Sequence, residues 1–220
     1  MIENEIVCKK INGFYINLKH RSDRKEHFEN YKIKFDFLKN IERFDAIYDE
    51  KYGVGCALSH ILCLEKCLEL NDDYYLIMED DFYLLNEDNF NEFIDEFEKI
   101  KNNNEWDVIT LTPRGETKEK YFYKSFHKII DNQTATGYII KHNFINVLLP
   151  ILKEGLEGLK KANNKKESHP FVNDQVWKPL QLKNNWLYFH KIFGGQLPSY
   201  SDIKKRNVNY NERFLKQLDF

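Results

Sequence analysis

The sequence lacks an apolar run long enough to cross a membrane. A spanning helix needs about 18 consecutive apolar residues, and no such run occurs among the 220 residues. Residues 1–10 also lack the long apolar segment of a signal peptide. We therefore expect no membrane span and a cytoplasmic location. A viral origin stays open, as does a larger protein of which this chain is one domain.

An excess of positive charge is also missing. Lys and Arg number 33 and Asp and Glu number 35, which gives a net charge of −2. Sequence-independent binding to nucleic acid needs a basic surface, so we expect no nucleic-acid partner. The sequence leaves the oligomeric state open.

Cysteine is scarce, with four residues. Cys63 and Cys67 are four positions apart on an expected helix, which is the spacing of half a zinc site. No matching Cys or His pair follows at zinc-finger spacing. We therefore expect buried free thiols, and an intracellular reducing compartment, for Cys8, Cys56, Cys63 and Cys67.

What remains of the composition is typical of a folded α/β protein. Hydrophobic residues make up 42% of the chain and aromatic residues 15%, which is ample for a core. Expected strands or extended stretches are 11–18, 33–37, 41–47, 74–78, 107–112, 122–130, 136–140 and 186–193. Expected helices are 21–32, 53–70, 88–100, 143–152 and 172–182. This alternation predicts an α/β fold, and we expect one domain over 1–220.

Two segments carry separate expectations. Residues 155–169 are rich in Lys, Asn and Gly, which predicts a mobile loop, with a short helix at 156–161 as the alternative. Residues 204–220 are expected to form a charged C-terminal tail.

Residues 74–82 are the most informative stretch. An apolar run ends there in three adjacent acids, Glu79, Asp80 and Asp81. Function in open α/β sheets concentrates at the carboxyl ends of such strands. Crowded carboxylates repel one another unless a positive group lies among them, and Mg²⁺ or Mn²⁺ prefers oxygen ligands. Taken alone, the segment fits a helix cap or a solvated turn equally well.

A basic segment follows the first expected strand. Residues 17–24 include Asn17, Leu18, Arg21 and Arg24. Two Arg at the point where a strand opens into a helix form a suitable site for an anion or a nucleotide. A solvated basic face is the alternative.

Ser59 and His60 lie near the start of the helix expected after Gly53. Adjacent residues on a helix point to different faces, and a Ser-His hydrolase needs its nucleophile on a strained elbow, so hydrolysis is a poor interpretation. We expect both residues to shape a ligand pocket. A packed or capping His60 is equally open.

Three later features complete the set of candidates. Asp174 lies near an expected helix start, where it suits a helix cap or a catalytic carboxylate. His190 ends a late strand and is a candidate metal ligand or a structural histidine. Gln196, Ser199 and Ser201 lie in a loop that could reach back to the site.

Six segments follow one another in a recognisable order. They are Tyr15–Arg24, Gly53–His60, Leu76–Asp81, Thr136–Ile140, Phe171–Asp174 and Gln196–Ile203. This order resembles glycosyltransferase family 25, which includes lipopolysaccharide-modifying glycosyltransferases and procollagen galactosyltransferases. The first three resemble the family's Asn-Leu…Arg…Asp-Arg motif, its Gly-x-x-Gly-Cys-x-x-Ser-His motif and its Glu-Asp-Asp motif. In the second of these, this sequence has one residue fewer between the two Gly.

The resemblance implies a fold and an activity. The expected fold is of GT-A type, a Rossmann-like mixed sheet flanked by helices. The expected reaction is metal-dependent, with Mn²⁺ or Mg²⁺, and inverts the anomeric centre. It would move a hexose, most simply galactose or glucose, from a UDP-sugar to a hydroxyl of a glycan or of a hydroxylysine-type protein acceptor.

The resemblance also implies roles for the candidate residues. Asp81 would hold the metal, with His190 as a further ligand. Asp174 would take the proton of the acceptor hydroxyl. The donor would be bound by Asn17, Leu18, Arg21, Arg24, Ser59, His60, Glu79 and Asp80.

Two other functions stay open. A module that binds a nucleotide-sugar or a carbohydrate without turnover would share this fold, since fold does not imply function. A metal-dependent phosphoryl transferase is less consistent with the sequence, because no P-loop or kinase-like motif is present.

Overall fold

The computed structural model describes residues 10–215, without the side chains of 116–119 and 215. The strands are β1 Gly13–Asn17, β2 Ile41–Asp45, β3 Tyr74–Glu79, β4 Phe82–Leu84, β5 Val108–Thr110, β6 Gly115–Tyr123, β7 Phe126–Asn132, β8 Gly137–Lys141, β9 Trp186–Phe189, β10 Gly194–Gln196, β11 Ser199–Ser201 and β12 Arg206–Val208. The α-helices are α1 Ser22–Lys34, α2 Val54–Leu68, α3 Glu87–Glu98, α4 His142–Lys161, α5 Lys165–Ser168, α6 Asn173–Val176, α7 Lys178–Lys183 and α8 Asn211–Leu215. Short 3-10 turns occupy Asp36–Leu38 and His169–Phe171.

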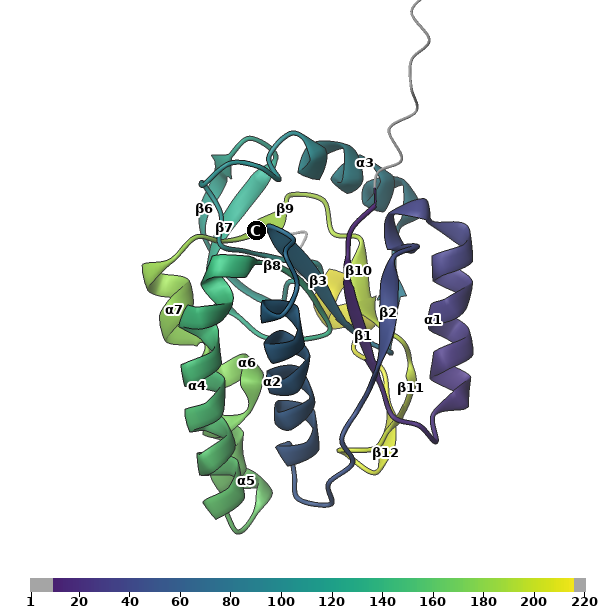
Figure 1. The fold of residues 1–220 in the computed structure, drawn as a ribbon, viewed down its shortest axis with the longest axis vertical. Helices are drawn as coiled ribbons and strands as arrows, with labels where there is room; N and C mark the ends of the chain where they lie inside the picture. Colours follow the sequence, from purple (N-terminus) through teal and green to yellow (C-terminus); the bar gives the residue numbers. More distant parts are fainter. Residues whose placement is uncertain (1–9, 216–220) are drawn as a thin grey trace, which may run out of the picture.

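The centre of the fold is an eight-stranded mixed sheet in the order β2-β1-β3-β8-β5-β9-β7-β6 (Figure 1). Strands β2, β1 and β3 pair in parallel, and so do β5 and β9. The pairs β3–β8, β5–β8, β7–β9 and β6–β7 are antiparallel. This topology confirms the expected α/β class, with a mixed sheet flanked by helices.

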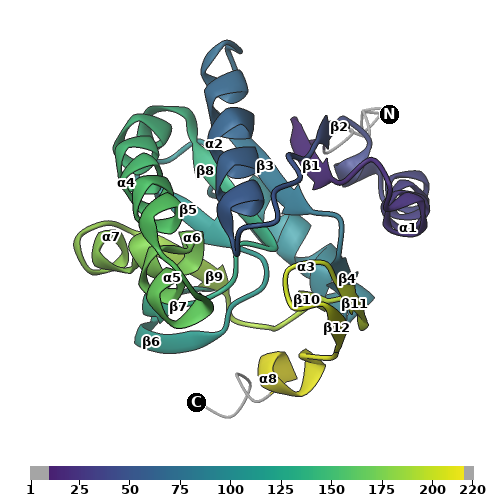
Figure 2. The ribbon, with the colours of Figure 1, turned by 90° about the horizontal axis from the view of Figure 1, so that it is seen from below.

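Both faces of the sheet are covered. Along β3, Tyr75 and Ile77 join the core cluster that includes α2 and α4, while Leu76 and Met78 join the cluster on the other face. Side chains of a strand alternate between faces, so each face needs its own apolar layer. Figure 2 shows α2 and α4 together above one face of the sheet. The apolar run of β3 therefore reflects burial on both sides.

The loop expected at 155–169 is wrong and its alternative, a helix at 156–161, is confirmed, because α4 continues to Lys161 and α5 follows at Lys165. Leu156 and Leu159 are buried on the core face of α4. The glycines there serve close packing: a Cβ on Gly158 would lie 2.2 Å from Cδ1 of Phe171. The Gly content of this segment therefore reflects close helix packing and not flexibility.

Two strand predictions also need correction. Residues 33–37 are the end of α1 and a 3-10 turn, and Ile33 is 83% exposed, so the apolar residues do not share one face. The strand expected at 122–130 is instead the hairpin β6–β7, which turns at Lys124 with φ 50°. A non-glycine residue with positive φ is uncommon, and a lysine in the sequence does not indicate a turn.

The C-terminal segment contains three short strands and a short helix between Gly194 and Leu215, where a loop and a charged tail were expected. Strand β10 pairs with β4, and β11 pairs with β12 in a hairpin. Figure 2 shows these strands and α8 at one side of the main sheet. Part of the tail expected at 204–220, residues 216–220, lies outside the described residues, as does Cys8.

Within the described ranges, no helix is both long and apolar enough to cross a membrane. The cytoplasmic location and the single domain over 1–220 stay predictions. Cys56, Cys63 and Cys67 are free thiols. Cys63 and Cys67 are buried, as expected, whereas Cys56 is only partly buried.

Candidate active site

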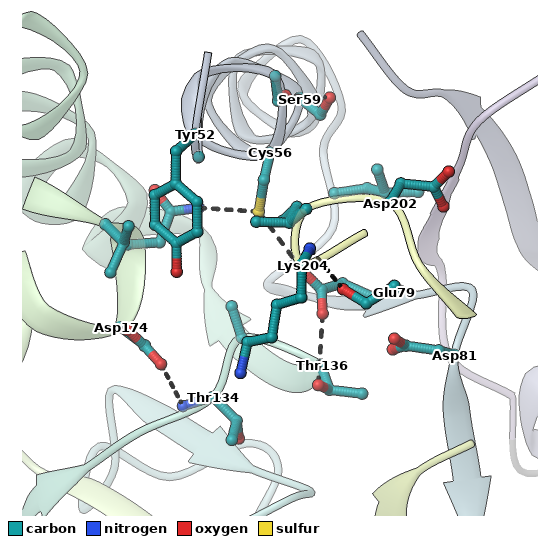
Figure 3. Close-up of a pocket in the computed structure, with 18 of the residues that line it drawn as sticks. Tyr52, Cys56, Ser59, Glu79, Asp81, Thr134, Thr136, Asp174, Asp202 and Lys204 are labelled. Atoms are coloured by element: carbon teal, nitrogen blue, oxygen red, sulfur yellow. Dashed lines mark hydrogen bonds between the residues drawn. The ribbon is translucent and has the colours of Figure 1, made fainter. Parts of the chain in front are cut away.

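A cavity of about 650 Å³ lies where β1 and β3 end and α2 begins. Its walls combine the loop before α2, the end of β3, the segment before β8, α6 and the C-terminal strands. Figure 3 shows acids from several of these elements around it. The predicted site residues that line it are Leu18, Arg24, Ser59, His60, Glu79, Asp80, Asp81 and Asp174. Gln196 and Ser201 also line it, so the late loop does reach back to the site.

Asp80 is fully engaged by neighbouring side chains. Asn17 Nδ2 donates to its Oδ2 at 2.7 Å, and Arg24 Nη1 donates to its Oδ1 at 2.9 Å. Burial raises the pKa of Asp80, although Arg24 and Asn17 act to lower it. Asn17 and Asp80 therefore brace the ends of β1 and β3 together.

Arg21 is not among the residues that line the cavity. Its guanidinium contacts Asp23 at 2.9 and 2.8 Å and Asp202 Oδ2 at 2.6 Å. It also donates to the carbonyl of Tyr200 at 3.0 Å. The structure thus corrects the expectation that Arg21 faces the ligand: it fastens the β11–β12 hairpin to the start of α1.

Asp81 has an unsatisfied carboxylate oxygen. Its Oδ2 lies 3.3 Å from Nη1 of Arg24, while its Oδ1 is buried without a hydrogen-bond partner. Burial and the charge of Glu79 raise the pKa of Asp81 to about 7, although Arg24 and the side chain of Gln196 act to lower it. A buried, unpartnered anionic oxygen is costly, and a cation beside it would remove that cost.

Glu79 is the centre of a small cluster. His60 Nε2 lies 3.4 Å from its Oε1, the Cys56 thiol donates to the same oxygen at 3.5 Å, and Thr136 Oγ1 donates to its Oε2 at 3.3 Å. Burial acts to raise the pKa of Glu79, but the hydrogen bonds from His60 and Cys56 outweigh it and the pKa is lowered. Figure 3 shows Cys56, Glu79 and Thr136 in this arrangement.

Sequence reasoning missed Cys56 as part of the site. Its signal was available, because Cys56 and His60 are four positions apart on α2, as Cys63 and Cys67 are. Burial, followed by the charge of Glu79, raises the pKa of the Cys56 thiol well above its ordinary value.

Ser59 and His60 have different surroundings. The Ser59 hydroxyl accepts from the Ile47 amide at 2.8 Å and donates to the Gly55 carbonyl at 2.6 Å, so it holds the loop before α2 in place. His60 is buried, with its Nδ1 3.1 Å from the hydroxyl of Tyr138. The two alternatives for His60 therefore both hold: it is packed, and it lines the cavity.

Asp174 reaches the cavity from the short helix α6. Its Oδ2 accepts from the Thr134 amide at 3.1 Å (Figure 3). Its Oδ1 accepts from Nε2 of Gln175 at 3.1 Å. The N-cap position of α6 is Val172, so Asp174 is not a helix cap. Its carboxylate is held by a separate chain segment and faces the shared cavity.

His190 does not line the cavity, which corrects its expected place beside Asp81. Its Nδ1 lies 3.0 Å from the carbonyl of Ser125, at the turn between β6 and β7. Its ring packs against Tyr121, His127 and Phe189. His190 therefore lies at the end of β9 and contacts the β6–β7 hairpin.

Three cations surround Tyr210 on another wall of the cavity, and sequence reasoning missed them. Lys204 Nζ lies 4.6 Å from the ring centroid, and the guanidinium carbons of Arg213 and Arg114 lie 5.3 and 6.0 Å from it. Arg114 is also held by Gln133 at 2.8 Å. Like charges repel, so this wall suits an anionic group.

Three solved structures share a distant likeness with the chain. The chain is 12% identical to a glycosyltransferase involved in the glycosylation of the major capsid of PBCV-1, over 94% of this chain and 91% of that one, with a TM-score of 0.49. It is 10% identical to a mutant Drosophila β1,4-galactosyltransferase 7 in complex with manganese, UDP-Gal and xylobiose, over 91% and 71%, with a TM-score of 0.42. It is 10% identical to a mannose-1-phosphate geranyltransferase from Thermus thermophilus, over 82% and 73%, with a TM-score of 0.47. Likenesses at this level are too weak to assign a function.

Comparison at the family level is decisive. No curated protein matches the chain. The model of glycosyltransferase family 25, described as an LPS biosynthesis protein, matches residues 51–219. That range contains α2 with Cys56 and His60, the acids at the end of β3, Asp174 and the C-terminal strands. The chain therefore belongs to glycosyltransferase family 25 and is a glycosyltransferase.

Proposed function

We propose that this glycosyltransferase moves a hexose, galactose or glucose, from a UDP-sugar to an acceptor hydroxyl, with inversion and with a divalent metal. The observation that carries the proposal is the buried, unpartnered Oδ1 of Asp81 at the wall of a cavity of about 650 Å³. The family description names lipopolysaccharide biosynthesis, so a glycan is the first acceptor to test, ahead of a hydroxylysine-type protein acceptor.

The acids at the end of β3 fit a hard divalent cation. Asp81 offers a free oxygen, and the charge of Glu79 acts on the same carboxylate. Mn²⁺ or Mg²⁺ is held by oxygen ligands of this kind. When bound, such an ion would neutralise the charge that develops on the departing diphosphate. Asp80 already pairs with Arg24, so we assign it the role of positioning the neighbouring residues and not of binding the ion.

The donor would lie between the two charged walls of the cavity. Leu18 and Arg24 line it near the acids, and Lys204, Arg114 and Arg213 line it near Tyr210. Cationic side chains of this kind suit the phosphates of a nucleotide-sugar. Asn17 supports the site indirectly through its hydrogen bond to Asp80.

Asp174 is the proposed base. Inversion requires a single in-line attack, in which a carboxylate takes the proton of the acceptor hydroxyl. The carboxylate of Asp174 lines the cavity and is oriented by the Thr134 amide. Each of its oxygens keeps lone pairs beyond the bonds to Thr134 and Gln175.

The test is release of UDP from a panel of UDP-, GDP- and CMP-sugars, with Mn²⁺ or with EDTA. We expect release from a UDP-sugar that needs Mn²⁺ and is lost in Asp81→Asn. The matched control Asp88→Asn changes an exposed acid at the start of α3 and should keep activity.

Binding of UDP separates the remaining outcomes. Mn²⁺-dependent binding without release, on addition of glycan acceptors, would favour the alternative of a non-catalytic binding module on this fold. No binding of UDP in any condition would overturn the nucleotide-sugar proposal.

A further inference from the structure

Three side chains of metal-binding type meet in the cavity wall. The ligand atoms of Cys56, His60 and Glu79 all lie within 4.8 Å of one another. His60 Nε2 is 3.4 Å and Cys56 Sγ is 3.5 Å from the same oxygen of Glu79. A zinc ion sits about 2.0–2.3 Å from nitrogen, oxygen and sulfur ligands, so one ion among these atoms reaches all three after small side-chain movements.

The cluster stands on rigid elements. Cys56 and His60 are one helical turn apart on α2, and Glu79 ends the buried strand β3. Side chains at i and i+4 lie on the same face of a helix, so both point toward the end of β3. A loop need not close to bring the ligands together.

A second layer of hydrogen bonds orients two of the three ligands. His60 Nδ1 lies 3.1 Å from the hydroxyl of the buried Tyr138, which leaves Nε2 directed at the cluster. Thr136 Oγ1 donates to the second oxygen of Glu79 at 3.3 Å. Metal-binding histidines typically have their other ring nitrogen fixed in this way.

The chemistry of the ligands selects the kind of ion. Mg²⁺ and Mn²⁺ prefer oxygen, whereas a thiolate with an imidazole and a carboxylate suits Zn²⁺. We propose that Cys56, His60 and Glu79 form a binding site for Zn²⁺ or a similar thiophilic divalent ion, distinct from the oxygen site at Asp81. Binding replaces the thiol proton of Cys56 with the ion, and the proton passes to solvent.

The proposed site has an open position. Three protein ligands leave one of the four tetrahedral positions of zinc free. All three residues line the cavity, so that position is accessible to water or to an oxygen of a bound ligand. The proposal does not depend on sugar transfer, because it concerns binding of the ion alone.

Cobalt is the probe for the test, because a cobalt–thiolate bond absorbs in the near ultraviolet. The full chain, freed of metal, would be titrated with Co²⁺. We expect a charge-transfer band that saturates at one ion per chain and disappears when Zn²⁺ displaces Co²⁺. Tyr138→Phe should weaken Co²⁺ binding about tenfold to a hundredfold, as loss of outer-layer partners does.

Matched variants decide the assignment. Cys56→Ser should abolish the band, whereas Cys63→Ala removes a buried thiol seven positions away and should keep it. Asp81→Asn should also keep the band, which separates this site from the one proposed for transfer. Circular dichroism checks that each variant folds. No band in the native chain, or a band that survives Cys56→Ser, would overturn the proposal.

Discussion

Arg24 on α1 and Asp80 at the end of β3 form a buried ion pair, with Nη1 2.9 Å from Oδ1. The same guanidinium donates to Ser199 and to the carbonyl of Tyr200 in the C-terminal hairpin. Its Nη1 also lies 3.3 Å from Asp81. One side chain thus joins the first helix, the acid cluster and the last strands.

Replacing Arg24 should destabilise the protein strongly. Arg24→Gln leaves Asp80 buried without its cation, and removal of one partner of a buried pair costs about 3–5 kcal/mol. Urea denaturation of the metal-free protein measures this. As a control, Lys153→Gln breaks the more exposed pair with Glu65 and should cost less than about 1 kcal/mol. Similar losses in both variants would contradict a special role for the Arg24 pair.

We expect acid to destabilise the protein through protonation of His127. Burial, followed by the charges of His190 and Lys120, lowers the pKa of His127 to about 4. An unfolded histidine titrates near pH 6.5, so the unfolded state takes up the proton first as the pH falls. The contribution of neutral His127 to stability is complete above about pH 6.5 and is lost as the pH falls toward 4.

The matched variant for this prediction is His127→Asn, whose side-chain oxygen can still accept from the Tyr121 amide that His127 Nδ1 accepts at 2.7 Å. Thermal melts of both proteins from pH 7.5 to pH 4 should show a steeper acid loss in the native sequence. Parallel pH profiles would show that His127 does not titrate in this way.

Gly158 should resist substitution although it lies in a helix. Alanine in a helix interior usually gains about 1 kcal/mol over glycine. Here the added Cβ would lie 2.2 Å from the ring of Phe171, so Gly158→Ala should cost about 1–3 kcal/mol instead. Adding Phe171→Ala, which removes a partly exposed ring, should restore the usual gain. Denaturation of the single and double variants measures the coupling, and independent effects would refute the contact.

Asp174→Asn should separate catalysis from binding. Asparagine keeps an oxygen for the Thr134 amide but cannot take a proton, and loss of a general base lowers kcat by about 10²–10⁴-fold. The Kd of UDP should change little, because the base acts on the acceptor. Transfer kinetics and calorimetric titration of UDP measure the two quantities. An unchanged kcat would remove Asp174 from the reaction.

Much of the fold follows from local pattern. The continuous apolar run of β3 predicted a strand buried on both faces, and the apolar face of 53–70 predicted α2. The sequence left residues 156–161 open between a loop and a helix, because glycines serve both flexible loops and tight helix packing. Only the position of Phe171 against Gly158 decides between these.

The order of residues along the chain establishes which chemical groups are available: acids at the end of a buried strand, arginines after another strand, and motifs in the order of one family. Which of these groups meet depends on the packing of the whole fold. In the folded protein Arg24 pairs with Asp80 and Arg21 pairs with Asp202. His190 contacts the carbonyl of Ser125. The fold also brings Cys56 to Glu79. The spacing of apolar residues along a helix or strand is visible among neighbouring residues. Side-chain partners that are distant in sequence depend instead on how the helices pack on the sheet.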